Sequence, residues 1–576
     1  MKEFFYNLKF AWKYCKALKL QLINYIICNI LSVVISVIIP ILSANVIIKL
    51  TNNEFYQLIS ISIIIFIIEN IRNIVNTKGR YHSQIIYRES FINIQTELSK
   101  EILKLENKII DENSSGTFIQ RLTNDTSRLA DIFNVLNIYI TKIIIDIGIF
   151  VAIFIISKKV FLFILCSVII LYLIENTRTK IYNDNDKIYR KNQDNVSGFV
   201  GELVRGMRDI KMLNAEDSFI NEMQGKIISL NKERYAMQNT DRKFHLLRAF
   251  VRDLIDLLLI ILLVILIINK DLSIANALII HNYSSRLPSL IDYVGILLEK
   301  IKDFNLSSSR IFDIINSKEF TKEEFGTIHL SKINGDFEFR NVEFSYDKNK
   351  VLNNVNFKIH ANETVAFVGK SGSGKTTIFN LICKMYKVNK GEILIDGINI
   401  NNLDKDSIRG NITIISQNPY IFNFSIRDNL KLVKMDLTEN EMIKACKLAC
   451  LHDFIMSLPN KYDTIIGEGG VNLSGGEKQR LAIARALIQK TEIILFDEAT
   501  SALDNETQSS IQKAIDNMKN EYTILIIAHR LSTIANCDRI LLLNNGKIEA
   551  EGTHKQLLKN SKTYKDLYNS EIINNS

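Results

Sequence analysis

The segment from Gly369 to Thr376 reads GKSGSGKT and has the spacing of a phosphate-binding loop. The apolar run Thr364 to Val368 before it predicts a buried strand, and we expect a helix to begin near Thr377. Glycines let backbone N–H groups converge on phosphate oxygens, and a helix N-terminus adds partial positive charge. Lys375 should pair with the β and γ phosphates of ATP, and Thr376 should ligate Mg²⁺. The residues predicted to bind ATP here are Gly369, Lys370, Ser371, Gly372, Ser373, Gly374, Lys375, Thr376 and Thr377.

A second run, Ile493 to Phe496, ends in the two acids Asp497 and Glu498. Two carboxylates at the end of a buried strand are costly unless a cation or hydrogen bonds hold them. Mg²⁺ would offset that cost: Asp497 would support the metal shell, directly or through water, and Glu498 would orient or deprotonate the attacking water. Such an acid pair alone is more often a strand end, but a phosphate loop in the same chain favours a site.

The sequence LSGGEKQR, Leu473 to Arg480, resembles the signature motif of ABC ATPases. Ser474, Gly475 and Gly476 should open a helix, which predicts a further anion site from physics alone. The resemblance implies that this site faces the phosphate loop of a second subunit, so that a dimer encloses two ATP molecules. One position departs from the family pattern, because Glu477 stands where many members have glutamine.

Other positions match this family one by one. Tyr346 resembles the aromatic residue that stacks on adenine, and Gln417 resembles the glutamine that reaches Mg²⁺. Asp504, which ends the sequence SALD, resembles the D-loop aspartate, and His529 resembles the switch histidine at the γ-phosphate. The resemblance therefore implies a catalytic set of Glu498, His529 and Gln417, with Thr376, Gln417 and Asp497 around Mg²⁺. The segment TIIGEG, 464–469, resembles the x-loop of exporter-type members; a plain surface turn is the alternative.

The pattern of short β-branched runs that carries these motifs begins at about Phe337. Further runs at Ile412 to Ile415 and Thr523 to Ile527 alternate with helix-like segments, as in an α/β domain. We predict a nucleotide-binding domain at 337–576 after a linker at 311–336.

The first half of the chain contains apolar stretches near the ~20 residues that span a bilayer. They predict a six-helix, all-α transmembrane domain at 20–310, after a cytoplasmic segment at 1–19. The first stretch is too long for the apolar core of a signal peptide, so we expect it to remain in the protein. The stretches are Leu20 to Ile48, Phe55 to Val75, Ile138 to Ile156, Val160 to Ile174, Leu254 to Ile268 and Ile274 to Leu298.

Long polar connections at about 79–135 and 176–246 alternate with very short ones, which assigns the two sides of the membrane. The long connections and the N-terminal segment are rich in lysine and arginine, so the positive-inside tendency places both termini in the cytoplasm. Within them, Gly116 to Asp125 and Glu202 to Glu216 resemble the intracellular loops of type IV exporters. We expect a multi-pass protein of the cell membrane, and the abundance of Ile, Asn and Lys hints at a bacterial source.

The net charge of +9 could suggest nucleic acid, but no basic stripe with interleaved aromatics is present, and we expect no nucleic-acid partner. Ionisable residues inside apolar stretches are candidates for a cargo path, with pairing between helices as an equal alternative. These residues are Glu69, Arg72, Asp146, Arg252, Asp253, Asp256, His281 and Arg286.

The resemblance implies an ATP-driven half-transporter that exports peptide, drug or lipid-like amphipathic cargo. Both nucleotide motifs are intact, which favours a homodimer, although pairing with a degenerate partner stays open. One alternative is an importer of a metal-chelator complex with the same fold. Another is an ATP-gated channel or sensor, against which Glu498 and His529 argue, because gating needs binding more than turnover.

Overall fold

The computed structural model describes residues 2–51, 53–113, 115–284, 288–316, 319–346, 349–467, 470–497, 505–528 and 534–575. The predicted site residues Glu498, Asp504 and His529, and the predicted cavity residue Arg286, lie outside this part of the chain. Two compact units form: a helical unit of 1–103 and 114–319, and a sheet unit of 104–113 and 320–576.

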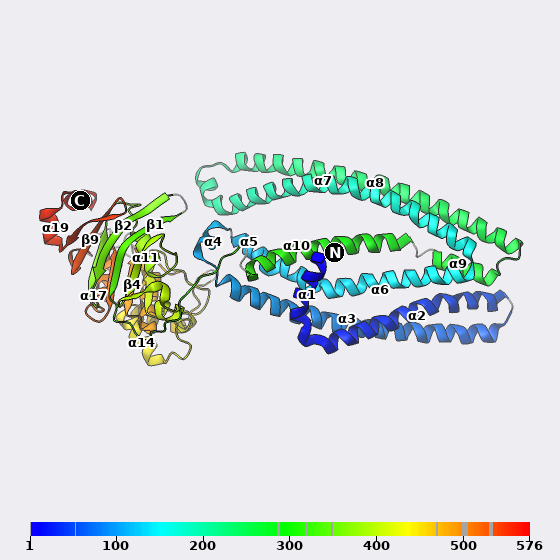
Figure 1. The fold of residues 1–576 in the computed structure, drawn as a ribbon, viewed down its shortest axis with the longest axis horizontal. Coiled ribbons are helices and arrows are strands. Elements are labelled where there is room, and N and C mark those ends of the chain that lie inside the picture. The colour runs from blue at the N-terminus through cyan, green and yellow to red at the C-terminus, as the bar shows by residue number, and fades with distance from the viewer. Residues whose placement is uncertain are drawn as a thin grey trace. The chain divides into compact units, whose positions relative to one another are not determined.

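The helical unit consists of long helices joined by short turns (Figure 1). Ser157 shows how such a turn forms: its backbone is extended and its side chain accepts a hydrogen bond from the Val160 N–H, which caps the next helix. The helices are α1 (Lys2–Cys15), α2 (Lys19–Thr51), α3 (Phe55–Ile102), α5 (Ser115–Gln120), α6 (Thr126–Ile156), α7 (Lys158–Met212), α8 (Glu216–Ile268), α9 (Ile274–Ser284) and α10 (Pro288–Asn316).

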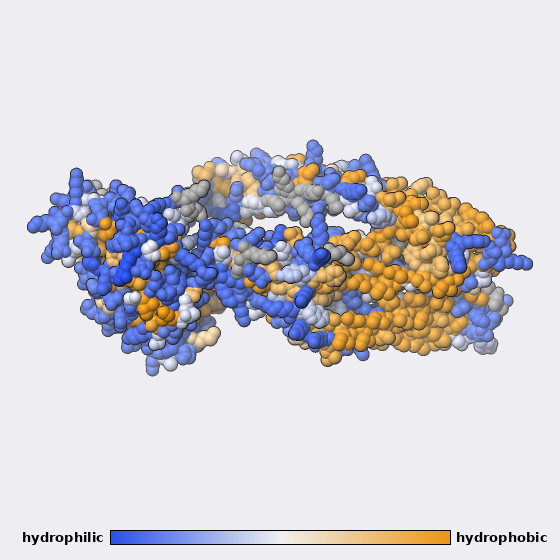
Figure 2. All heavy atoms as spheres, viewed as in Figure 1, coloured by the Kyte–Doolittle hydropathy of each residue, from blue (hydrophilic) through white to orange (hydrophobic). Residues whose placement is uncertain are grey.

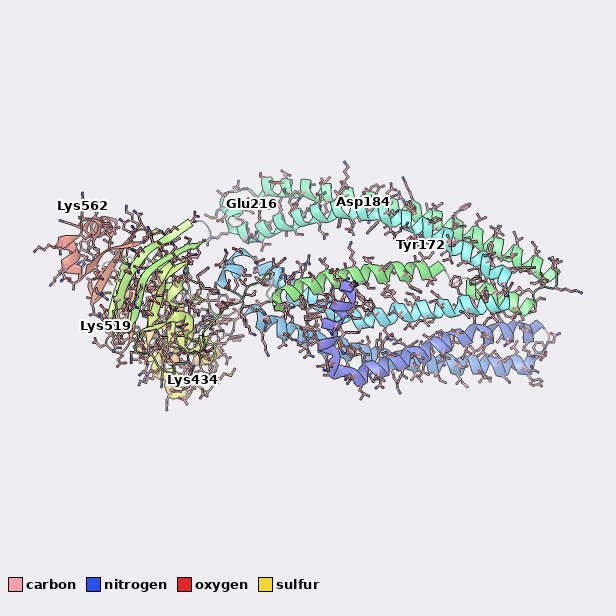
Figure 3. The ribbon with its side chains drawn as sticks, viewed as in Figure 1. Tyr172, Asp184, Glu216, Lys434, Lys519 and Lys562 are labelled. Atoms are coloured by element: carbon pink, nitrogen blue, oxygen red, sulfur yellow. The ribbon has the colours of Figure 1, made fainter. Side chains whose placement is uncertain are left out.

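The predicted spans are only the apolar parts of these helices. The second span was expected to end at Val75, but α3 continues to Ile102, and α7 and α8 carry the predicted polar connection at 176–246 as helix. Helix-forming polar residues extend the helices beyond the apolar run, because backbone hydrogen bonding does not depend on hydropathy. In Figure 3, Tyr172 and Asp184 lie along α7, and Glu216 begins α8. The sixth predicted stretch falls on α9 and α10.

Apolar side chains cover one half of the helical unit (Figure 2). They form a broad band along the helices in the half that contains the α2–α3 and α8–α9 turns, whereas these turns and most of the other half are hydrophilic. Within the described residues, four helical stretches are long and apolar enough to cross a membrane: Lys2–Leu50, Phe55–Ile102, Ser115–Ile156 and Lys158–Asp186. A contiguous exposed apolar surface of this kind is expected to contact lipid.

The sheet unit contains two sheets (Figure 1). In the described residues, one has the order β2-β1-β4-β5 and the other the order β10-β9-β3-β8-β7-β6. The strands of the first sheet are antiparallel: β1 (Phe337–Tyr346), β2 (Asn349–Ile359), β4 (Lys390–Ile395) and β5 (Ile398–Asn399). The second sheet is parallel except at its edge strand β10: β3 (Thr364–Val368), β6 (Ile412–Ile415), β7 (Ile493–Asp497), β8 (Thr523–Ile527), β9 (Arg539–Asn544) and β10 (Lys547–Gly552).

Alternation along the parallel strands creates a core on each face of the second sheet. Val365 and Phe367 pack with the antiparallel sheet, whereas Ala366 and Val368 pack with the opposite layer of helices. All four predicted strands of this sheet are confirmed, with β7 one residue longer than expected. The helices of the unit are α4 (Asn107–Glu112), α11 (Lys375–Ile382), α12 (Lys405–Arg409), α13 (Ile426–Lys431), α14 (Glu439–Leu448), α15 (His452–Ser457), α16 (Gly475–Gln489), α17 (Asn505–Asp516), α19 (His554–Asn560) and α20 (Lys562–Asn575).

Candidate nucleotide site

The loop from Gly369 to Gly374 connects β3 to α11, the position that phosphate binding requires. Gly372 and Gly374 have φ of +77° and +104°, which side-chain-bearing residues rarely adopt. A Cβ at Gly374 would lie 2.7 Å from Leu352 Cδ2, so the Leu352 side chain would have to move to admit any other residue. Helix α11 begins at Lys375, two residues before the expected start near Thr377. The loop amides are therefore held next to a helix N-terminus, where an anion is stabilised.

Two buried polar groups lie in this loop. Lys375 is 5% exposed, and its Nζ donates hydrogen bonds to the carbonyl oxygens of Gly369 at 2.8 Å and Lys370 at 3.1 Å. Ser373 is 6% exposed, and its Oγ has no hydrogen-bond partner among the described residues. A buried hydroxyl without a partner is unfavourable, and phosphate oxygens would supply one. The loop thus has the donors of a polyphosphate site.

The end of β7 approaches the start of α11. Thr376 Oγ1 donates a hydrogen bond to Asp497 Oδ1 at 3.3 Å. The parallel register explains this, since Asp497 pairs with Ile527 of β8 and Ile527 pairs with Phe367 of β3, so the strands end at one edge. A hydroxyl and a carboxylate are hard oxygen ligands, and Mg²⁺ in nucleotide sites takes few protein ligands besides phosphates. Thr376 and Asp497 therefore fit a Mg²⁺ ion bound together with nucleotide phosphates.

Ser474 caps the signature helix α16, as the sequence predicts. Its Oγ accepts from the Glu477 N–H at 3.3 Å, and the Glu477 carboxylate accepts from the Ser474 N–H at 2.7 Å. This reciprocal pair is a capping box. Ser474 and Gly475 are exposed at the helix end, while Gly476 is buried. The exposed end can receive an anion from outside the sheet unit.

Two residues that sequence reasoning missed connect α16 to Gln417 and the segment after it. Gln479 is 3% exposed, and its Nε2 donates to the Gln417 carbonyl oxygen at 3.0 Å. Arg485 donates to the carbonyl oxygens of Tyr420 at 3.1 Å and Asn429 at 3.0 Å, and burial lowers the pKa of its guanidinium. A spacing of six does not place two residues on the same face of a helix, so the sequence carried no local signal for these contacts. The predicted Mg²⁺ ligand and the signature helix are thus hydrogen-bonded to one another.

Tyr346, the predicted adenine-stacking residue, lies at the end of β1 and is 36% exposed. The rings of Phe344 and Tyr386 meet it edge-on at centroid distances of 4.8 and 5.1 Å. Tyr386 donates a hydrogen bond to Asp111 of α4, and burial together with that carboxylate raises the pKa of Tyr386. Aromatic neighbours in edge contact fix the orientation of the Tyr346 ring.

Tyr346, the phosphate loop, Gln417, Asp497 and the signature residues belong to one folded unit, in which hydrogen bonds join Thr376 to Asp497 and Gln417 to Gln479 of the signature helix. Glu498, Asp504 and His529 lie just outside described elements: β7 ends at Asp497, α17 begins at Asn505, and β8 ends at Ile527. Their roles stay predictions.

Comparison with known proteins gives consistent matches over both units. The family described as ABC transporter matches residues 352–501, and the family described as ABC transporter transmembrane region matches residues 22–287. A Bacillus subtilis (strain 168) protein, provisionally named as a multidrug export ATP-binding/permease protein, is 31% identical over 542 residues, covering 90% of each chain. An ATP-dependent lipid A-core flippase of Haemophilus influenzae (strain 86-028NP) is 30% identical over 90% of this chain and 89% of its own.

A solved structure of a bacterial Atm1-family ABC exporter with ATP bound superposes with a TM-score of 0.83. The match covers 96% of this chain and 98% of the other, at 23% sequence identity. At this identity the likeness supports the fold, a transmembrane helical region followed by an ABC ATPase domain.

Proposed function

Because the chain belongs to the ABC transporter family, as a multi-pass membrane protein with its own ATPase domain, we propose that it exports an amphipathic cargo from a bacterial cell as a homodimer of half-transporters. The observation that carries the proposal is that one sheet unit holds both a phosphate loop with a buried lysine and an exposed, capped signature helix. Two copies therefore supply two complete ATP sites. The names of the relatives, which give multidrug export and lipid A-core flipping, support export of amphipathic molecules.

Each proposed ATP site combines residues of two subunits. Tyr346 stacks on adenine, and the residues Gly369 to Thr377 hold the phosphates. The partner's Ser474, Gly475 and Gly476 bind the γ-phosphate from the other side. Thr376, Gln417 and Asp497 hold Mg²⁺, which neutralises phosphate charge when bound. Glu498 takes a proton from the attacking water, and His529 donates to the γ-phosphate.

Closure of two ATPase domains on ATP would shift the population of transporter states, because ATP makes both sets of contacts only in the closed dimer. The first long polar connection joins the two units through the chain itself. Its residues 104–113 fold with the sheet unit, and Asp125, further along the same connection, is buried in the helical unit. Asp125 accepts a hydrogen bond from Ser307 of α10 at 2.7 Å and lies 3.7 Å from Arg310. These contacts support a role for this connection in transmitting movement.

The ionisable residues predicted for a cargo path divide into different groups. Glu69 and Arg72 lie 3.8 Å apart, and Asp146 is 4% exposed within α6. In contrast, Arg252, Asp253, Asp256 and His281 line one pocket of about 340 Å³ between α7, α8 and α9, together with apolar residues that include Val168, Leu171 and Leu259. Glu69 and Arg72 thus pair within one helix, whereas Asp256 of α8 and His281 of α9 pair between helices, 3.8 Å apart, and both line the pocket.

We assign this pocket to the cargo. Asp256 lies twelve residues before Ile268, the end of α8, which corresponds to roughly 18 Å of helix and hence to the interior of a ~30 Å hydrocarbon layer. A charge at such depth marks a functional position by default. His281 is 3.8 Å from Asp256. Carboxylates beside an apolar wall favour cargo with a positive group and a hydrophobic body.

We expect Asp256→Asn to weaken stimulation of ATP hydrolysis by a cationic amphipathic dye about tenfold, since a charge-assisted contact of roughly 1.4 kcal/mol is lost. Basal hydrolysis should be unchanged. Asp271→Asn, in the turn after α8, is the matched control. Equal dye stimulation in both variants would remove Asp256 from the cargo site.

Reconstitution into liposomes with the ATPase domains outside tests the whole proposal. External ATP should drive accumulation of a fluorescent amphipathic cation in the lumen, which corresponds to export. Movement out of preloaded vesicles would instead indicate an importer, and steady hydrolysis without flux would indicate a channel or sensor. Mass determination of the singly expressed protein would show whether the homodimer forms.

A further inference from the structure

Glu477 places a negative charge at the N-terminus of the signature helix. Its carboxylate accepts the Ser474 N–H at 2.7 Å, while the Ser474 hydroxyl accepts the Glu477 N–H at 3.3 Å. In the part of the chain that the structure describes, Glu477 forms no ion pair that would neutralise this charge. The carboxylate is thus stabilised by the helix end alone.

Capping does not require this charge. Helix α19 has the same reciprocal box with a glutamine: Gln556 Oε1 accepts the Thr553 N–H at 2.9 Å, and Thr553 Oγ1 accepts the Gln556 N–H at 3.4 Å. Helix α14 has the acidic form, with Thr438 and Glu441. The chain therefore shows that glutamine and glutamate both close the box, so the box of α16 would survive removal of the charge at position 477.

Under the function proposed above, the N-terminus of α16 also has a second role. The exposed Ser474 and Gly475 would bind the γ-phosphate of the ATP on the partner subunit. The Glu477 carboxylate already occupies the Ser474 N–H and the favourable end of the helix dipole. When the dimer closes, two anions would compete for one helix end, and like charges at the same helix end repel.

We propose that Glu477 sets the affinity of the signature helix for the γ-phosphate and holds the closed, ATP-bound dimer at a lower population than glutamine would. Closing requires that the carboxylate give up its hydrogen bond to Ser474 or tolerate the phosphate beside it. Cargo binding then has more influence on closure, because the dimer is less stable without cargo. Glu477 is a tuning residue for ATP, and it has no part in ADP binding, since ADP lacks the γ-phosphate.

Glu477→Gln in the full-length protein tests this, since it keeps the box and removes the charge. We expect the ATP concentration for half-maximal hydrolysis to fall about tenfold at low salt. Inhibition by ADP should be unchanged. Raising the ionic strength should shrink the difference, because salt screens the repulsion. Glu441→Gln, the same exchange in the box of α14, should change none of these quantities.

Two results would overturn the inference: identical ATP dependence of the unaltered protein and the Glu477→Gln variant at every salt concentration, or an equal shift in ATP and ADP affinity. The first would leave the residue as a cap only, and the second would indicate a general change of the fold. Failure of the proposed function can be told apart from failure of the inference about Glu477. If the proposed function is wrong, the unaltered protein will lack ATP-driven flux, whatever the Glu477→Gln variant does.

Discussion

Lys375→Met is expected to reduce ATP hydrolysis about 100-fold, which equals roughly 2.7 kcal/mol of transition-state stabilisation. Nζ of Lys375 is held inside the loop by two carbonyl oxygens, 2.8 and 3.1 Å away, where it can reach the β and γ phosphates. Methionine keeps most of the length of the side chain but loses the charge-assisted hydrogen bonds. The measurement is the rate of phosphate release by the purified, reconstituted protein.

Lys405→Met is the control for this prediction, because Lys405 is an exposed lysine of α12 in the same unit. Its hydrolysis rate should match that of the unaltered protein. The melting temperature of Lys375→Met should be determined as well, since the lysine also ties the loop to itself. A folded Lys375→Met protein with nearly full activity would mean that the loop holds phosphate through its backbone amides alone.

Glu498→Gln is expected to retain ATP and to lower hydrolysis by about 100-fold to 10,000-fold, the usual contribution of a general base. Glutamine has the same shape but accepts no proton from water. The matched control is Glu492→Gln at the other end of β7, where the side chain pairs with Lys332 at 3.4 Å. Retained ATP, measured by binding, and phosphate release are the two readouts. Near-normal phosphate release by Glu498→Gln would exclude Glu498 as the base.

Much of the sheet unit could be predicted because its strands are short, apolar and bounded by glycine or polar residues. Thr364–Val368, Ile412–Ile415 and Thr523–Ile527 are strands at the predicted bounds. The ends of the helices in the helical unit were harder to predict from the sequence. Hydropathy marks where a helix meets lipid and not where it ends, so α7 continues through Met212 although its apolar run stops near Ile174.

Segment 104–113 could not be assigned from sequence. It belongs to a polar connection of the predicted transmembrane domain, yet it folds with the sheet unit. The Glu106 N–H donates to the Thr321 carbonyl oxygen at 3.1 Å, and Asn107 Nδ2 lies 2.8 Å from Met385 Sδ. From the sequence alone, polar residues such as Glu106 and Asn107 are expected to face solvent. Their partners Thr321 and Met385 lie more than 200 positions away in the chain.

The sequence by itself determined the chemistry that depends on neighbours in the chain. The phosphate loop, the cap of α16 and the acid at the end of β7 need only a few consecutive residues, because local backbone conformation places their groups. Only the tertiary structure decided which of these groups meet. Thr376 and Asp497 are 121 positions apart, and Gln479 and Gln417 are 62 apart. Such contacts depend on strand order and on the packing of helices against the sheet, which no local spacing encodes.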